Sequence, residues 1–129
     1  MMVAQPAAGW LAERLGVDLS DPGLLERALT HRSHGPDHNE RLEYLGEAVV
    51  SFTVSVILFQ RFPDAREGEL SRYRASLVSG EALAAIAASL GLGDQLRLGE
   101  GEMKSGGQRR ATILADALEA LVGAIYLDR

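Results

Sequence analysis

Acidic residues recur at helical spacing in two separate segments of the chain. Glu40, Glu43 and Glu47 follow one another at intervals of three and four residues, which places their side chains on one face of a helix. Asp116 and Glu119 repeat the interval of three near the other end of the chain. Because like charges on one helix face repel each other, a bound cation is the usual reason for a folded chain to hold them.

The second pair of acids lies in an apolar segment. Asp116 and Glu119 are the only charged residues in ILADALEALV at 113–122. Burying a carboxylate in such a helix costs on the order of several kcal/mol unless the group is paired or bound to a metal. Two carboxylate clusters on two helices therefore indicate a site for a hard cation with oxygen ligands. Simple solvation or salt bridging is the alternative, and the apolar flanks argue against it.

Four blocks of sequence, in order along the chain, resemble the ribonuclease III family of double-strand-specific RNA endonucleases. The segment HNERLEYLGE at 38–47 resembles the signature of that family, and ALTHRS at 28–33 resembles the block before it. The later blocks are EGELSR at 67–72 with RASLV at 74–78, and KSGG at 104–107 with Arg110, ILAD at 113–116 and GAIYLD at 123–128. The resemblance covers most of the chain, so residues 1–129 are identified as a single ribonuclease III-type endonuclease domain.

The resemblance implies a cofactor, a reaction and a set of site residues. The cofactor is Mg²⁺, with Mn²⁺ as a substitute, and metal ions in a carboxylate cluster can activate water and stabilise the charge on a leaving oxygen. The reaction is hydrolysis of double-stranded RNA to 5′-phosphate and 3′-hydroxyl ends. The implied metal-binding and catalytic residues are Glu43, Glu47, Asp116 and Glu119, with Glu40 and Glu67 in a wider acidic site. For these last two, a plain salt bridge or a helix-dipole role is equally open.

Glu47 departs from the family pattern, in which Asp follows the signature glycine. The extra methylene displaces the carboxylate by roughly one bond length. Mg²⁺ requires near-octahedral geometry, and functional sites tolerate displacements of only about 0.5 Å. We therefore expect metal to bind but cleavage to be slowed or lost. An RNA-binding protein that does not cut, or a structural subunit of a ribonucleoprotein, is the alternative function.

Further residues are candidates for contacts with partners. The resemblance implies that Tyr44 inserts into a cavity of a second subunit in a symmetric homodimer, and core packing is the alternative for this side chain. His31 is expected to pack or hydrogen-bond beside the signature helix rather than to act as a general base. The basic residues that could contact the RNA backbone are Arg72, Arg74, Lys104, Arg109 and Arg110.

The expected fold is all-α, because the chain has no alternating β-branched runs between turns. We predict helices at 8–15, 22–31, 39–61, 67–79, 80–90 and 109–127, with a glycine-rich loop at 99–107. In the long helix, apolar residues recur at intervals of three and four and predict a buried stripe. These residues are Leu42, Leu45, Val49, Phe52, Val56 and Phe59.

Composition narrows the class of protein further. The 129 residues, of which 47% are hydrophobic, fit one domain with its own core. Cysteine is absent, which excludes a disulfide framework and a thiolate metal site. With no signal peptide or membrane-spanning run recognised, we expect a cytoplasmic protein without membrane association. Bacterial members of the family usually continue into a double-stranded-RNA-binding domain, which is absent from this chain. The net charge of −5 predicts weak, salt-sensitive RNA binding by this chain alone.

Overall fold

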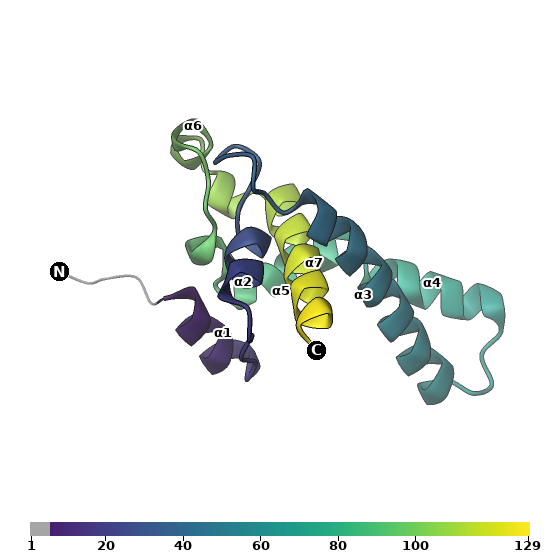
Figure 1. Ribbon diagram of the computed structural model, residues 1–129. Helices are drawn as coiled ribbons and strands as arrows, with labels where there is room; N and C mark the ends of the chain where they lie inside the picture. Colours follow the sequence, from purple (N-terminus) through teal and green to yellow (C-terminus); the bar gives the residue numbers. More distant parts are fainter. Residues whose placement is uncertain (1–5) are drawn as a thin grey trace.

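The computed structural model describes residues 6–129, and helices account for all the regular elements among them. The all-α expectation is therefore confirmed (Figure 1). The α-helices are α1 (Ala7–Leu15), α2 (Pro22–Ala28), α3 (Glu40–Arg61), α4 (Glu67–Leu77), α5 (Gly80–Ser89), α6 (Glu100–Lys104) and α7 (Ala111–Asp128). Two short 3₁₀ helices, η1 (Leu92–Gln95) and η2 (Gly107–Arg109), complete the order.

Helix α7 lies at the centre of the domain. It packs against α2, α3 and α5, and most of its residues from Ile113 to Ala124 are buried. The main core joins α7 to Trp10 and Leu11 of α1, to Leu29 and to Leu92. The Trp10 Nε1–H also donates a hydrogen bond of 2.8 Å to the Leu90 carbonyl oxygen. The central position of α7 explains why its two acids are surrounded by apolar residues in the sequence.

Side chains define the starts of two helices. The Asp21 carboxylate accepts a hydrogen bond from the Gly23 N–H at 2.9 Å, and Pro22 occupies the first helical position of α2. The Ser79 hydroxyl accepts from the Ala82 N–H at 3.1 Å and caps α5. Such caps satisfy backbone donors that have no partner within the helix. They determine where α2 and α5 begin.

Two expectations about local structure were wrong. Helix α2 ends at Ala28 rather than at residue 31, because the next residues pair with Arg97. The Arg97 N–H donates to the Leu29 carbonyl at 2.8 Å, and the His31 N–H donates to the Arg97 carbonyl at 2.9 Å. The glycine-rich segment 99–107, expected to be a loop, contains the short helix α6.

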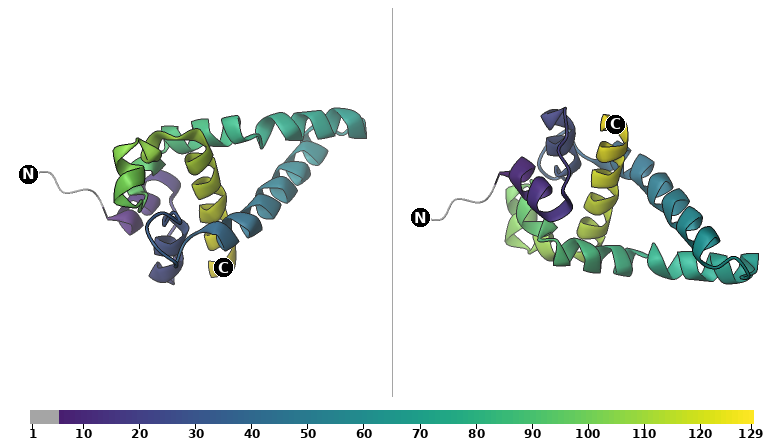
Figure 2. Two further views of the ribbon diagram at one scale, coloured as in Figure 1. Left: turned by 90° about the horizontal axis from the view of Figure 1, so that it is seen from above. Right: turned by 90° about the horizontal axis from the view of Figure 1, so that it is seen from below.

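Helices α3 and α4 project from the rest of the domain. Figure 2 shows the second half of α3 and the whole of α4 leaning away from α7, with the loop that joins them at the tip. We call this part, residues 50–77, the arm. Helix α3 satisfies the length and composition of a membrane-spanning helix, with a mean hydropathy of 1.6 in a window that is 17% buried. The core helix of a soluble protein satisfies the same test of length and composition.

The predicted buried stripe of α3 was wrong for the arm. Leu42 is buried, but the side chains of Phe52 and Phe59 are 71% and 73% exposed, and Val56 is also exposed. The periodic spacing correctly marks one face of the helix. That face runs past α7 and is not covered by another element among residues 6–129, so a single chain leaves it in water.

The backbones of α3 and α7 touch where the two helices cross. A Cβ atom placed on Gly46 would overlap the carbonyl oxygen of Glu119, and one on Gly123 would overlap the carbonyl oxygen of Leu42. The overlaps are with backbone atoms, which a side-chain rotation cannot relieve. Glycine at both positions is therefore what allows this close crossing.

We expect Gly46→Ala to lower the free energy of unfolding by about 1–3 kcal/mol or more, because α3 must move away from α7. Thermal unfolding followed by circular dichroism measures the change. Gly101→Ala is the matched control, since a Cβ there meets nothing within 4 Å and alanine favours a helix over glycine. Equal unfolding temperatures for the two variants would contradict the close-contact interpretation.

Candidate metal centre

Three acids from two helices meet beside the crossing of α3 and α7. Glu43 from α3 and Asp116 and Glu119 from α7 each offer a carboxylate oxygen, and these oxygens lie within 4.8 Å of one another. Glu43 precedes Gly46 by one helical turn, and the Glu119 backbone lies against Gly46. The glycine contact therefore sets the separation of the two helices at the point where their acids face each other. We call Glu43, Asp116 and Glu119 the carboxylate cluster.

The carboxylate cluster is electrostatically unfavourable in the absence of a cation. Burial raises the pKa of Glu119 to about 7, and the negative charges of Glu47, Asp116 and Glu43 act in the same direction. Burial is also the first cause of the raised pKa of Glu43 and of Asp116. Three oxygen ligands that lie close together and repel one another are the donor set that a hard divalent cation prefers. The residues present therefore fit such an ion.

A polar pocket of about 260 Å³ opens beside the carboxylate cluster. It contains Glu43 and Asp116 from the cluster, together with Glu40 and two residues of the loop after α2, His31 and Arg32. Its remaining lining residues are Asn39, Thr112 and Ile113. The pocket gives the cluster access from solvent and adds a positive side chain at its edge.

The other predicted acidic residues have different positions. Glu47 is exposed and lies outside the group within 4.8 Å, but its charge raises the pKa of Glu119. Glu40 lines the polar pocket. Glu67 begins α4, and from Glu43 to the end of α3 the helix is on the order of 27 Å long at 1.5 Å per residue. Within one chain, Glu67 therefore does not join the carboxylate cluster.

Tyr44 is not a core residue. Its side chain is 80% exposed, so the alternative of core packing was wrong. It lies at the edge of a hollow of about 690 Å³. The hollow is lined largely by apolar residues, among them Leu24, Pro36, Leu42, Leu45 and Leu127.

Three of the five basic residues proposed to contact RNA have partners in the structure. The Arg74 guanidinium donates to the Ser55 hydroxyl at 2.9 Å and links α4 to α3. Lys104 pairs with Glu100 at 3.1 Å, and Arg110 pairs with Glu102 at 3.0 Å. Arg72 and Arg109 are exposed. The contact of these five residues with RNA stays a prediction.

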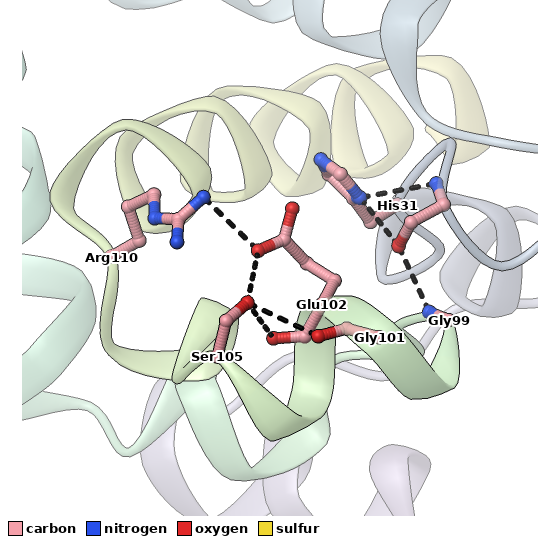
Figure 3. Close-up of polar contacts among 7 residues, drawn as sticks. His31, Gly99, Gly101, Glu102, Ser105 and Arg110 are labelled. Carbon is pink, nitrogen blue, oxygen red and sulfur yellow. Dashed lines mark hydrogen bonds and ion pairs between the residues drawn. The ribbon is translucent and has the colours of Figure 1, made fainter.

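Glu102 organises the segment between α6 and α7, a role that the sequence did not suggest. Its carboxylate forms an ion pair with Arg110 and accepts a hydrogen bond of 3.4 Å from the Ser105 hydroxyl (Figure 3). A Cβ on Gly107 would lie only 2.6 Å from the Glu102 Cγ, so this glycine leaves room for the side chain. The interval of eight residues between Glu102 and Arg110 fits no helical contact, which is why sequence spacing gave no signal.

His31 hydrogen-bonds as expected, but within its own loop. Its Nδ1 accepts from the Ser33 N–H at 3.1 Å and lies 2.8 Å from the Ser33 hydroxyl oxygen. The Gly99 N–H donates to the same hydroxyl at 2.8 Å. The loop after α2 is therefore fastened to the segment before α6.

The helical fold with a carboxylate cluster at its central crossing defines a domain suited to divalent-metal chemistry. The sequence model of the ribonuclease-III-like family matches residues 21–129, and the chain belongs to this family. Ribonuclease 3 of Pseudomonas fluorescens (strain SBW25) is 60% identical over 118 residues, which are 92% of this chain and 52% of that protein. Ribonuclease 3 of Shewanella amazonensis is 58% identical over the same shares. The chain thus spans about half the length of these curated relatives.

Solved structures support the same assignment. The nuclease domain of ribonuclease III from Campylobacter jejuni superposes with a TM-score of 0.90 at 44% identity, covering 92% of this chain and 84% of that one. Dicer from Pichia stipitis is more distant, with a TM-score of 0.68 at 30% identity over 88% of this chain and 48% of that one. The resemblance inferred from the sequence blocks is confirmed for the family and for the fold.

In metal-free buffer, we expect Glu119→Gln to raise the unfolding temperature at pH 8 and to lose this advantage as the pH falls. The pKa of Glu119 rises from 4.5 to about 7 on folding, so its cost to stability grows between these two pH values and is constant above them. Thermal unfolding between pH 4.5 and 8 measures the effect.

Asp64→Asn, in the exposed loop at the tip of the arm, is the control for the loss of one negative charge away from the cluster. Identical pH profiles for the two variants would show that the carboxylate cluster is not the source of the effect.

Proposed function

We propose that this chain is the nuclease domain of an endoribonuclease that hydrolyses double-stranded RNA to 5′-phosphate and 3′-hydroxyl ends. The observation that carries the proposal is the carboxylate cluster of Glu43, Asp116 and Glu119, whose oxygens lie within 4.8 Å of one another. The 60% identity to a ribonuclease 3 supports it. Recognition would depend on the A-form shape, phosphates and 2′-hydroxyls of the duplex rather than on its bases.

Mg²⁺ is the proposed cofactor, held by the carboxylate cluster with Glu47 beside it. A divalent cation in such a site supplies an activated water and stabilises negative charge on the leaving oxygen. The part played by the chain is to present acids on two helices locked by the Gly46–Gly123 contact. Because the pKa of Glu119 is about 7, binding of the ion at neutral pH would release protons from the cluster.

Glu47 decides how active the domain is. We expect Glu47→Asp to cleave a labelled RNA duplex faster than the unaltered chain in Mg²⁺, because the shorter side chain restores the carboxylate position typical of the family. Rates of product formation from gels measure the difference. Asp116→Asn is the control that removes a member of the carboxylate cluster, and it should abolish cleavage both in the unaltered chain and in combination with Glu47→Asp.

The outcomes separate the candidate functions. Equal rates for the unaltered chain and the Glu47→Asp variant would show that Glu47 is a working ligand and that the expected impairment is wrong. Duplex binding without cleavage by either protein would favour the alternative of an RNA-binding protein. Failure to bind both duplex and metal would contradict the nuclease proposal.

A homodimer formed through α3 is the proposed assembly. Tyr44 is 80% exposed, and the apolar side chains Phe52 and Phe59 of the arm are 71% and 73% exposed. The Campylobacter jejuni nuclease domain has a flexible region described as involved in dimer formation. In a two-fold dimer each surface is used twice, so Tyr44 of each subunit would enter the hollow beside Tyr44 of the other.

Tyr44→Ala is expected to shift the protein from a dimer toward its monomer mass of 13.9 kDa. The substitution is present in both subunits, so it removes the aromatic contact on both sides of the interface. Light scattering during gel filtration over a range of protein concentrations measures the mass. Tyr44→Phe keeps the ring and should remain dimeric. A monomeric unaltered chain, or an unchanged dimer in Tyr44→Ala, would contradict this role.

A further inference from the structure

The loop after α2 brings a positive side chain to the edge of the polar pocket. Arg32 is the only Arg or Lys among the residues that line it, and it faces a wall that includes Glu40, Glu43 and Asp116. We propose that Arg32 binds a phosphate of the RNA strand that enters this pocket. The inference rests on the proposed nuclease function and identifies a substrate-binding residue outside the carboxylate cluster.

The Arg32 guanidinium is available for a ligand. Its nearest carboxylate oxygen is that of Glu40 at 3.9 Å, and the two side chains are 71% and 52% exposed. Such an exposed pair, longer than a hydrogen bond, contributes little to stability. In contrast, the guanidinium of Arg110 lies 3.0 Å from its carboxylate partner. A planar guanidinium with unused donors matches two oxygens of a phosphate.

The backbone around Arg32 is fixed in place. The His31 N–H donates to the Arg97 carbonyl at 2.9 Å, and the Ser33 hydroxyl accepts from the Gly99 N–H at 2.8 Å. Hydrogen bonds therefore hold the residues on both sides of Arg32, while its own side chain extends into solvent. A loop anchored in this way reduces the entropy lost when the side chain binds a ligand.

The electrostatics of the pocket favour such a group. A phosphate that approaches Glu40, Glu43 and Asp116 meets negative charges at short range, and a cation in the cluster can offset only part of this repulsion. Arg32 adds a permanent positive charge, which partly offsets the rise that burial causes in the pKa of Glu43 and Asp116. A purely structural role as a counter-charge would produce this pKa effect without any contact with RNA, so the test must measure RNA binding itself.

The experiment measures binding of a fluorescent RNA duplex by anisotropy as a function of salt, with Ca²⁺ in place of Mg²⁺ as an oxygen-preferring ion. Each phosphate contact contributes about 0.9 to the slope of log K against log salt. Arg32→Gln should therefore reduce the slope by about one and weaken binding on the order of eightfold at 0.1 M salt. Arg32→Lys should keep the slope. Arg14→Gln, the same charge change on the exposed end of α1, should bind like the unaltered chain.

Three results would overturn the inference. Suppose that the folded Arg32→Gln variant shows an unchanged slope and affinity while the unaltered chain binds the duplex normally. This result would overturn the phosphate contact of Arg32 but not the proposed function. The same result with strengthened binding of Ca²⁺, as expected when a nearby positive charge is removed, would assign Arg32 to the structural role of a counter-charge. Absence of duplex binding by the unaltered chain would overturn the proposed function, and this inference with it.

Discussion

The direct contact between the backbones of α3 and α7 is the constraint on which the rest of the domain depends. Glycine at residues 46 and 123 lets the helices approach until carbonyl groups occupy the space of a missing side chain. At a more ordinary separation of about 8–10 Å between helix axes, Glu43 would stand farther from Asp116 and Glu119. The same contact packs α7 into the core, so the stability of the domain and the geometry of its acids share one origin.

The carboxylate cluster destabilises the folded state of the domain when no cation is bound. Burial raises the pKa of all three acids, and negative charges of neighbouring acids act in the same direction, so a stable core is needed to hold them together when no cation is bound. Residues at the rim moderate this repulsion. Arg32 is positive and close to Glu40, and its charge partly compensates the acids without entering the cluster.

The sequence predicted the helices well, because helices follow local rules, and the structure brings Glu43, Asp116 and Glu119 together from two of them. Spacing of three and four marks a helix face, and Asp21 with Pro22 marks the start of α2. What it missed depends on contacts between distant segments. The end of α2 is decided by pairing with Arg97, and the role of Glu102 by Arg110 across a turn. The exposure of Phe52 could not be predicted, because periodicity identifies an apolar face but does not say whether the same chain covers it.

Helix α3 combines two surfaces on one continuous rod of 22 residues. Its first turns carry Glu43 and the contact with α7, and its later turns carry Phe52 and Phe59 into water. A partner that covers the outer end of α3 would restrain the orientation of the helix. It would thereby also restrain the position of Glu43 at the inner end. By thermodynamic linkage, the affinity of the carboxylate cluster for a cation would then depend on whether the apolar face with Phe52 and Phe59 is covered. If a second copy of the chain covers that face, cation binding would depend on protein concentration, as it does in any enzyme whose working form is assembled by mass action.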